Sequence, residues 1–273
     1  MENAYENLFD AFSEERANKP RRTGLTIVRD EGLGLHQAED LMHVCGDYLD
    51  IIKIEQGTEA LYDKVFIKEK IGLYQDHNID TMPGESVLEI AIWHKVHEQY
   101  LKNAKDLGFA LMGISSGTIA MRQKIRKDVI EKSLKNGFKI ISIAGRKHPE
   151  ERLSLPAVFK LISDDLKMGV YKVLIKAEEY RNGFGICDSE GRIIKRQIVR
   201  FLEGVSDPDA LVWEAPFRNQ QQDLIFHLGL NVNLDGIAWD EVLSLEALRQ
   251  GFIGEKDKKA YLERKYWEDL QKV

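Results

Sequence analysis

The sequence predicts an α/β protein with a (β/α)8 TIM barrel, on the basis of three observations. Short, nearly continuous apolar runs alternate with longer helix-forming segments along the 273 residues. Such runs are typical of parallel strands that are covered on both faces. A barrel of eight strand and helix units needs about 250 residues. No Gly-x-Gly-x-x-Gly follows the first strand, which argues against an open dinucleotide-binding sheet.

The clearest unit lies between residues 108 and 147, where a strand, a helix and a strand follow one another. The apolar runs 109–115 and 139–145 flank the helix-forming segment 122–136. The first run ends in Ser115-Ser116-Gly117 and the second in Gly145-Arg146-Lys147. Because the loops after the strands form the site of such a barrel, we expect ligands at these small polar and basic residues.

The first three units precede this stretch. Strands are predicted over 24–30, 48–54 and 78–82, and helices over 35–45, 59–76 and 87–93. Gly32 and Gly34 mark the first loop, and Ser86 is a candidate cap for the third helix.

The last three strands are predicted over 170–175, 210–214 and 230–234, with helices over 156–168, 220–228 and 239–250. We therefore expect an N-terminal arm over 1–20, the barrel over 21–253 and a charged C-terminal helix over 254–273. Apolar residues recur at roughly helical spacing in that last segment: Tyr261, Leu262, Tyr266, Trp267 and Leu270. This stripe predicts packing on the barrel or on another subunit, and hence a homo-oligomer.

The composition indicates which classes of partner the protein can bind. The formal charge of −6 and the pI near 5.7 show no basic footprint for nucleic acid. No apolar run is long enough for a membrane span, and the acidic start lacks the features of a signal peptide. We expect a cytoplasmic protein that binds a small molecule, with no membrane partner. Cys45 and Cys187 are predicted to be buried thiols.

Polar residues at the predicted strand ends are the site candidates. They are Asp30, Lys53, Thr58, Glu85, Ser115, Ser116, Arg146, Lys147, Lys176, Glu178, Arg181, Glu214 and Asn233. The set is rich in bases, which predicts a small anionic ligand with a phosphate or carboxylate group. The alternative is that several bases point outward and pair with nearby carboxylates.

Strand parity and local context rank these candidates. Lys176 and Glu178 share a face because side chains alternate along a strand. Lys53 lies in an apolar strand, where a charge needs a ligand or a partner; a functional role is favoured over a structural ion pair. Glu214 ends a strand and is a candidate metal ligand or general base. His94 and His97 are placed on one helix, but no spacing typical of a zinc site occurs.

From about residue 22 to residue 254 the chain resembles the phosphosulfolactate synthases of coenzyme M biosynthesis. The stretches that carry the resemblance are Gly24-Leu-Thr-Ile-Val, Val44-Cys-Gly-Asp-Tyr-Leu-Asp, Lys53 with Gly57-Thr58, Met82-Pro-Gly84, Leu107-Gly-Phe109, Glu214-Ala-Pro216, Gln221-Gln222, Val232-Asn-Leu234 and Asp240-Glu-Val-Leu-Ser-Leu-Glu246. The resemblance implies a (β/α)8 barrel that adds sulfite to phosphoenolpyruvate with magnesium and without an organic cofactor. It places Lys53, Lys147 and Glu214 at functional positions.

The chain departs from the family pattern at several strand ends. The family's Glu-Ile-Ser-Asp-Gly after strand four is Gly113-Ile-Ser-Ser116-Gly117 here, and its Glu-Val-Gly-Lys-Lys is Ile143-Ala-Gly-Arg146-Lys147. A Glu and an Arg on strand six are Lys176 and Glu178. The family's Gly-Trp and Gly-Gly-Thr are here Glu55-Gln56 and Gly84-Glu85-Ser86. Because carboxylates are lost, we expect magnesium to be bound more weakly or by other groups, such as Glu85 and Glu178.

Three functions follow as hypotheses. The first is a divergent lyase that adds sulfite or another nucleophile to phosphoenolpyruvate or a related phosphorylated three-carbon acid. Its catalytic residues would be Lys53, Lys147, Lys176 and Glu178; its substrate contacts Asp30, Thr58, Ser115, Ser116, Arg146, Arg181 and Asn233; and its magnesium ligands Glu85 and Glu214. The second is a Schiff-base enzyme that uses Lys176, with Glu178 as proton shuttle. The third is an inactive barrel that serves as a binding or assembly protein.

Overall fold

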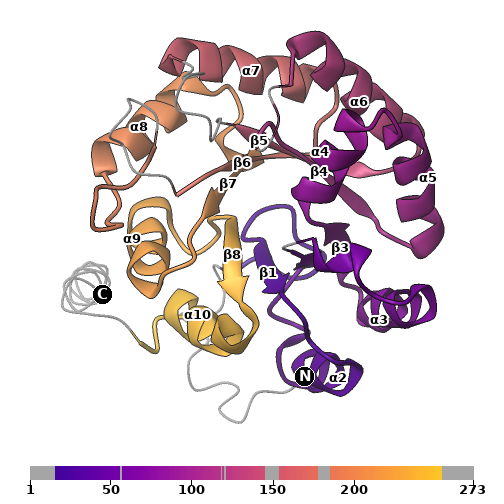
Figure 1. Cartoon of the computed structure of the whole chain (residues 1–273). Coiled ribbons are helices and arrows are strands. Elements are labelled where there is room, and N and C mark those ends of the chain that lie inside the picture. The colour runs from indigo at the N-terminus through magenta and orange to yellow at the C-terminus, as the bar shows by residue number, and fades with distance from the viewer. Residues whose placement is uncertain are drawn as a thin grey trace, which may run out of the picture.

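The chain folds into a ring of parallel strands surrounded by helices (Figure 1). The computed structural model describes residues 16–55, 57–117, 119, 121–144, 154–177 and 185–253. The strands are β1 (Thr26–Asp30), β2 (Ile51–Ile54), β3 (Asp80–Pro83), β4 (Leu111–Ile114), β5 (Lys139–Ala144), β6 (Lys172–Ile175), β7 (Leu211–Glu214) and β8 (Leu234–Ala238).

The strand order closes the sheet almost completely. The eight strands are hydrogen-bonded in the order β3-β2-β1-β8-β7-β6-β5-β4, and all pairs are parallel. The two end strands meet where the N–H of Ala110 donates to the carbonyl of Thr81 at 3.1 Å. The predicted (β/α)8 barrel is confirmed.

Helices cover the outside of this ring (Figure 1). They are α2 (Leu35–Cys45), α3 (Lys64–Asp76), α4 (Glu85–Trp93), α5 (His97–Leu107), α6 (Gln123–Lys135), α7 (Leu155–Lys167), α8 (Lys195–Gly204), α9 (Arg218–Leu228) and α10 (Val242–Arg249). Short 3-10 turns are η1 (Thr58–Ala60), η4 (Pro208–Ala210) and η5 (Trp239–Glu241). None of the helices in the described ranges is long and apolar enough to cross a membrane.

The helix after β3 differs from the prediction in two ways. Gly84 is its N-cap and Glu85 its first residue, so Ser86 lies within the first turn and is not the cap. His94 ends α4, whereas His97 begins α5. The two histidines do not share a helix because Lys95 between them has a φ of +61°, a left-handed conformation that interrupts a right-handed helix.

The eighth strand was predicted too early in the chain. Residues 230–234 resemble a strand, but the observed β8 is Leu234–Ala238. Residues 230–233 instead connect α9 to the sheet, after Gly229 ends the helix with a φ of +87°. Helix α8 was not predicted, although Ile198 and Phe201 bury its apolar face.

Side chains of the strands form two apolar layers. Ile27 and Ile51 belong to a cluster that fills the inside of the ring, whereas Val28 and Ile52 pack between the strands and the helices. Because side chains alternate along a strand, Arg29 and Lys53 also face the inside. These two residues are register partners on β1 and β2. The sheet therefore brings two basic side chains to its carboxyl end.

The predicted arm and C-terminal helix lie largely outside the described residues. Residues 16–20 are the exception: Nε of Arg16 contacts Oε1 of Glu246 on α10 at 3.2 Å, and both side chains are buried. The arm's last residues thus pack against the barrel. Residues 1–15 and 254–273 are not described, so the domain boundaries stay predictions.

The thiols and the surface agree with the composition. Cys45 and Cys187 are both buried, as predicted, and burial raises the pKa of Cys187 to about 11.

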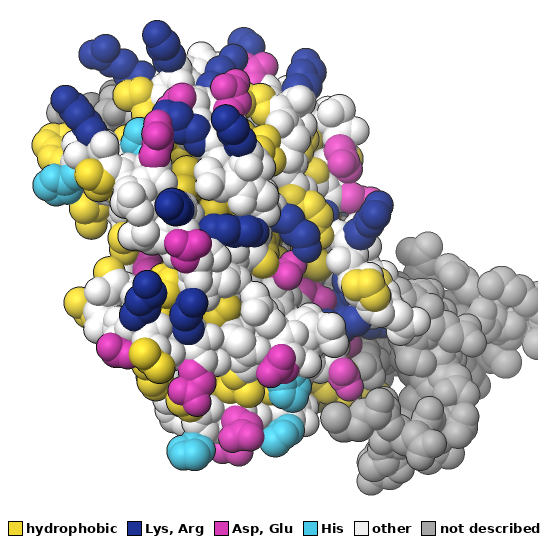
Figure 2. Space-filling view, turned by 90° about the vertical axis from the view of Figure 1, so that its right-hand side faces the viewer, with side chains coloured by type: hydrophobic (Ala, Val, Ile, Leu, Met, Phe, Trp, Pro, Cys, Tyr) yellow, Lys and Arg dark blue, Asp and Glu magenta, His cyan; other side chains and the backbone are white. Residues whose placement is uncertain are grey.

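On the face that Figure 2 shows, basic side chains are interspersed with acidic and neutral ones. That face carries no continuous basic surface of the kind that binds nucleic acid.

Candidate active site

Charged side chains form the uppermost layer inside the ring, at the carboxyl ends of the strands. Lys53 follows Ile51 on the inward face of β2, and Lys176 follows Leu174 at the end of β6. Glu214 ends β7 and is the register partner of Asp235 on β8. In a (β/α)8 barrel this end is where catalysis takes place. We call this layer the mouth.

Lys53 lies at the centre of the mouth. Its side chain is fully buried, and its Nζ lies 2.5 Å from Oε1 of Glu55, 2.9 Å from Oε1 of Glu85 and 3.6 Å from Oδ2 of Asp235. Burial lowers the pKa of Lys53, but the three carboxylates outweigh burial and raise that pKa well above its ordinary value. The lysine is therefore a cation held in ion pairs, and the functional role that was favoured for it stays a prediction.

The polar atoms of this cluster have unused hydrogen-bonding capacity. Among the described residues, both carboxylate oxygens of Asp235 are buried and have no hydrogen-bond partner, whereas Nζ of Lys53 and Oε1 of Glu85 form an ion pair with each other. A buried polar group without a partner costs about 1–3 kcal/mol, so such groups are rare unless water or a ligand completes them. The mouth is thus equipped to hydrogen-bond a bound polar molecule.

Asp235 was missed by the sequence reasoning because the eighth strand was predicted to end at Leu234. Burial raises the pKa of Asp235 to about 6, against the opposing effect of Lys53. A carboxyl group with a pKa near neutrality can both release and accept a proton. A carboxylate within an otherwise apolar strand was the available signal. Glu55, the other partner that the sequence does not single out, stands where the family pattern has a glycine.

A second ion pair joins β6 to β7. Nζ of Lys176 donates to Oε1 of Glu214 at 2.7 Å, and the N–H of Ala177 donates to Oε2 at 2.8 Å. Burial and the nearby Lys53 lower the pKa of Lys176, but Glu214, Asp235 and Glu85 outweigh them, so the pKa is raised. Lys176 is therefore protonated, and both oxygens of Glu214 hold hydrogen bonds.

Glu85 reaches the mouth from the first turn of α4. Its side chain passes over Gly113 of β4, where an added β-carbon would lie 2.7 Å from Cγ of Glu85. Burial raises the pKa of Glu85, but Lys53 and Lys176 outweigh burial and lower it. Glu85 is thus ionised, and the absence of a side chain at Gly113 makes room for it.

Glu59 is a further buried carboxyl group near the mouth, and it has no lysine partner among the described ion pairs. It lies in η1 and is buried, and neither of its side-chain oxygens has an aligned partner among the described residues. Burial, together with Glu85 and Glu55, raises the pKa of Glu59 to about 7. The sequence reasoning assigned this residue to a helix and missed it.

Asp30 lies outside the mouth, contrary to the prediction. It faces the helices, where its Oδ2 lies 2.5 Å from Nζ of Lys70 and accepts from the hydroxyl of Tyr74 at 2.8 Å. Its Oδ1 accepts from the N–H groups of Gly32 and Leu33. Strand alternation is the reason, since it turns the preceding residue inward and Asp30 outward. Asp30 fixes the first loop.

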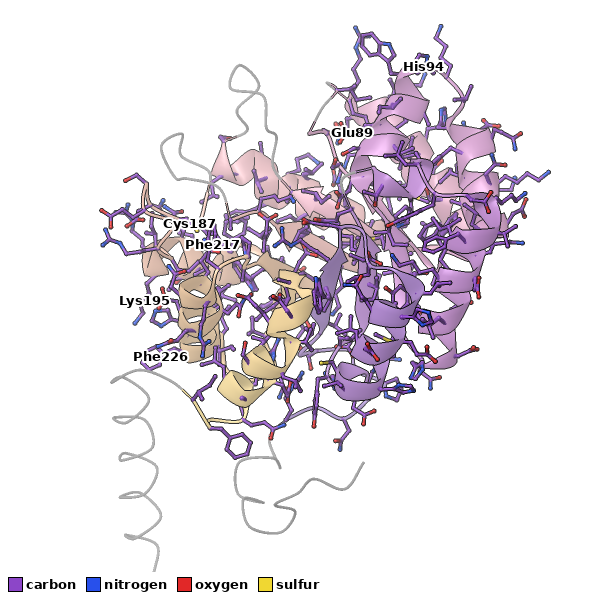
Figure 3. The ribbon with its side chains drawn as sticks, turned by 60° about the horizontal axis from the view of Figure 1, so that its bottom comes forward. Glu89, His94, Cys187, Lys195, Phe217 and Phe226 are labelled. Carbon is purple, nitrogen blue, oxygen red and sulfur yellow. The ribbon has the colours of Figure 1, made fainter. Side chains whose placement is uncertain are left out.

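Three predicted hydroxyl groups lie at the carboxyl end, Thr58 in η1 and Ser115 and Ser116 in the loop after β4. Thr58 donates to the carbonyl of Glu55 at 2.8 Å and so closes a turn. Ser115 donates to Oε1 of Glu89, and Ser116 is buried beside it. Glu89 also accepts from the N–H groups of Gly117 and Ile119. The carboxylate therefore fixes the loop after β4, and Figure 3 shows it on the inner side of α4, whereas His94 lies at the outer end.

Asn233 lies at the opposite end of the barrel. Its side-chain amide donates to the carbonyls of Asp209 and Leu211, and its oxygen accepts from the N–H of Leu25. Because β8 begins at Leu234, Asn233 precedes the strand rather than following it. It joins three segments at the amino end and is not part of the mouth, contrary to the prediction.

Four predicted site residues lie outside the described residues. They are Arg146, Lys147, Glu178 and Arg181. Their roles stay predictions.

The described carboxylates do not form a preassembled magnesium site. Glu85 and Glu214, the predicted ligands, hold the ammonium groups of Lys53 and Lys176. In the described ranges, no group of three or more His, Cys, Asp or Glu side chains is arranged to hold a metal ion. At these two predicted ligands, magnesium would have to displace an ammonium group from its carboxylate.

The fold and the mouth define a (β/α)8-barrel protein with a charged, enzyme-like site at the carboxyl ends of its strands. The family model described as (2R)-phospho-3-sulfolactate synthase (ComA) matches residues 14–255. The chain therefore belongs to the phosphosulfolactate synthase family, whose reaction is the addition of sulfite to phosphoenolpyruvate.

Individual relatives agree with this assignment. The chain is 35% identical to the phosphosulfolactate synthase of Methanothermobacter thermautotrophicus, covering 91% of this chain and 97% of the relative. It is 31% identical to that of Bacillus subtilis, covering 86% and 93%. Among solved structures, 3-hexulose-6-phosphate synthase from Salmonella typhimurium superposes with a TM-score of 0.55 at 11% identity, covering 82% of this chain and 97% of that chain. At that identity the likeness concerns the fold alone.

Proposed function

We propose that the mouth adds a nucleophile, sulfite or another, to phosphoenolpyruvate or a related phosphorylated three-carbon acid. The observation that carries the proposal is the fully buried ammonium of Lys53, held among three carboxylates with hydrogen-bonding capacity left over. Desolvating a charge is costly. A buried positive charge at the catalytic end of a barrel is suited to stabilising negative charge that develops in a substrate.

The reaction follows from the family's product. In 3-sulfolactate the sulfonate is on carbon 3, so sulfite forms a C–S bond there. The C2=C3 double bond breaks, its electron pair moves towards C2 and the carboxylate of the substrate, and C2 then takes a proton. We propose that Lys53 stabilises the negative charge that develops on the carboxylate. The addition involves no net electron transfer, and we propose that it needs no organic cofactor.

We propose Asp235 as the proton donor to C2. It adjoins Lys53, and a pKa of about 6 places its acid form within reach at neutral pH. Lys176 would provide a second positive charge beside the substrate. Lys147, Glu178, Arg146 and Arg181 keep their predicted catalytic and substrate-binding roles as part of the proposal.

Phosphorus NMR tests the proposal. The protein is mixed with phosphoenolpyruvate, sulfite and magnesium, with a second sample that lacks sulfite. We expect a new phosphomonoester signal that depends on sulfite. Replacing Lys53 by Met should abolish that signal, whereas Lys160→Met, an exposed lysine on α7, should leave it unchanged.

The same experiment separates the alternatives. A signal that appears with another nucleophile and not with sulfite would support the proposed lyase activity and identify that nucleophile, in place of sulfite, as its second substrate. No turnover with sulfite, thiols or amines would overturn the proposal and favour the inactive barrel that binds a partner.

Magnesium stays a proposal that rests on the resemblance. Its test is the binding of Mn²⁺, a paramagnetic substitute, followed by electron spin resonance in the presence and absence of phosphoenolpyruvate. We expect weak binding to the free protein because Glu85 and Glu214 are paired with lysines. Glu85→Gln and Glu214→Gln should weaken it further, and equal binding in both variants would remove these residues as ligands.

We also propose a homo-oligomer in the cytoplasm. Large apolar side chains are exposed on the described surface, among them Leu61, Val65 and Trp93, and such side chains are common in subunit contacts. Two buried thiols without a disulfide suit a reducing compartment. Light scattering that gives the mass of one chain would contradict the oligomer, and recovery of the native protein outside the cytoplasm would contradict the compartment.

A further inference from the structure

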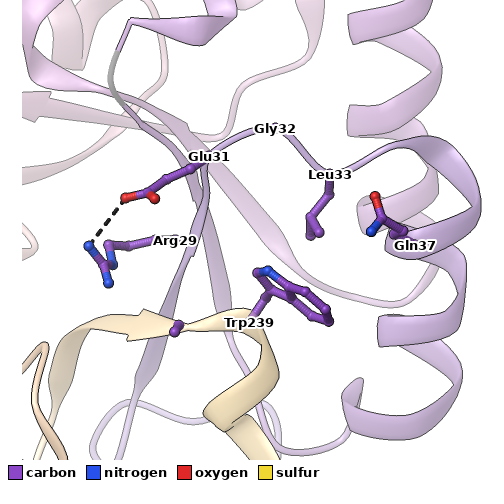
Figure 4. Close-up of a pocket in the computed structure, with 7 residues that line it drawn as sticks. Arg29, Glu31, Gly32, Leu33, Gln37 and Trp239 are labelled. Atoms are coloured by element: carbon purple, nitrogen blue, oxygen red, sulfur yellow. Dashed lines mark hydrogen bonds and ion pairs between the residues drawn. The ribbon is translucent and has the colours of Figure 1, made fainter.

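A cavity of about 290 Å³ opens beside the mouth, between β1, β8 and the start of α2 (Figure 4). Its lining includes Arg29, Glu31, Leu33, Gln37 and Trp239. Because Arg29 is the register partner of Lys53, the cavity adjoins the mouth. We call it the β1–β8 pocket. Its volume is near the lower limit for sites that hold small ligands.

The pocket carries one basic group that is weakly held. The guanidinium of Arg29 contacts Glu31, with 3.2 Å between Nη1 and Oε1, and 46% of the Glu31 side chain is exposed. Exposed ion pairs of this kind contribute about 0–1 kcal/mol. Nε of Arg29 is buried and has no aligned partner among the described residues. A second anion could therefore replace Glu31 at little cost.

Further hydrogen-bond donors line the same cavity. Oε1 of Gln37 accepts from the N–H of Gly34, which leaves the amide nitrogen as a donor. The first N–H groups of α2 precede its hydrogen-bonded turns and carry a partial positive charge. Gly32 has a φ of +138° and nothing within 4 Å of its missing β-carbon, so a ligand can approach the backbone closely.

The opposite wall of the pocket is apolar. Figure 4 shows Leu33 and the indole of Trp239 across from the Arg29–Glu31 pair. A ligand that satisfies both walls has an anionic group and a short carbon skeleton. A guanidinium binds carboxylate and phosphate groups with paired hydrogen bonds.

We propose that the β1–β8 pocket binds the carboxylate or phosphate group of a small organic acid, with Arg29 as its principal partner and Glu31 as the ion that the ligand displaces. The binding site stands independently of the reaction. Only the identification of its occupant as part of the substrate rests on the proposed function.

Trp239 makes binding observable. Inorganic phosphate and propionate are titrated separately into the full chain, and binding is followed by tryptophan fluorescence and by calorimetry. We expect a saturable signal in both measurements. Stronger binding of phosphate would assign the pocket to a phosphoryl group, and stronger binding of propionate to a carboxylate. Trp239→Phe should remove the fluorescence change and retain the heat of binding.

Two variants of opposite effect test the role of Arg29. Arg29→Leu should weaken binding at least tenfold, the loss of a charge-assisted pair of about 1.4 kcal/mol or more. Glu31→Gln should tighten it severalfold, because it removes the competing carboxylate. Arg192→Leu, which removes an exposed arginine paired with Asp188, is the matched control and should bind as the unaltered protein does.

Three results would overturn the inference: equal affinity in Arg29→Leu, unchanged affinity in Glu31→Gln, or a fluorescence change that persists in Trp239→Phe. If Arg29→Leu does not fold, the affinity of Glu31→Gln alone decides whether the pocket binds an anion in place of Glu31. Anion binding without any turnover of phosphoenolpyruvate would overturn the proposed function, but it would support the β1–β8 pocket as a binding site.

Discussion

The side chain of Glu85 occupies the space directly over Gly113, so that a β-carbon on Gly113 would lie 2.7 Å from Cγ and 3.3 Å from Oε1 of Glu85. The family pattern has the reverse arrangement, a glutamate at position 113 and a glycine at position 85. Two departures that read as independent changes in the sequence are therefore spatially complementary. The mouth therefore has a carboxylate at this place, but it belongs to Glu85 of α4 instead of to a residue of β4.

The exchange predicts the behaviour of variants at these two positions. Glu85→Gly should lower turnover because Lys53 loses a carboxylate, and Gly113→Glu should destabilise the fold because two side chains compete for one space. The double variant should recover both properties, as measured by phosphorus NMR and urea unfolding. Additive losses in the double variant would show that the two positions are not coupled.

Lys53→Met should lower the free energy of unfolding by about 3–5 kcal/mol at neutral pH, because Glu55, Glu85 and Asp235 lose their cation. Lys53 lowers the pKa of Glu85 and of Asp235, so both pKa values rise in the folded state when Lys53 is removed. The deficit should therefore be largest at pH 8 and shrink as the pH falls and the groups take up protons. Urea unfolding at pH 5 and pH 8 measures it, with Lys160→Met as control. A deficit independent of pH would contradict the electrostatic explanation.

Glu59 should make the protein less stable as the pH rises. Its pKa is about 7 in the folded state against a reference value of 4.5, so between these values the folded state binds more protons than the unfolded chain. The free energy of unfolding therefore falls as the pH rises through this interval. Glu59→Gln should stabilise the protein by an amount on the order of 3 kcal/mol at pH 8 and by little at pH 4. An equal effect at both pH values would refute the assignment.

Asp30→Asn should affect stability and leave the site chemistry intact. It removes the charge opposite the fully buried Lys70, and an uncompensated buried charge costs about 3–5 kcal/mol. Urea unfolding should show this loss, while turnover per folded molecule and phosphate binding stay unchanged. Loss of turnover in fully folded Asp30→Asn would return Asp30 to the list of substrate contacts.

Lys176 should not form a Schiff base at neutral pH. A Schiff base requires the neutral amine, and the carboxylates around Lys176 raise its pKa. Treatment with pyruvate and borohydride should give no mass gain on the peptide that contains Lys176. A stable adduct at that lysine would restore the Schiff-base hypothesis.

Local patterns in the sequence were sufficient to predict the barrel and to single out Lys53. The apolar runs specified eight strands and a helix after each of them except α8, because hydrophobic periodicity is a local property that each segment carries alone. The same reasoning identified Lys53, since a charge in an apolar strand needs a partner wherever the strand lies. Only the last strand was displaced, because Asp235 and Gly236 make it less apolar than the segment before it.

Folding brings the partners of Lys53 together and turns other candidates away from the mouth. Glu55 follows β2, Glu85 begins α4 after β3, and Asp235 lies on β8, and they meet at Lys53 through the pairing of β2 with β3 and of β1 with β2 and β8. Asp30 turns towards Lys70, forty residues further along the chain. Pairing between distant segments depends on sheet closure and helix placement, which no local pattern encodes. The sequence therefore predicts Lys53, Glu85, Lys176 and Glu214 as separate candidates, and the folded chain shows which of them pair.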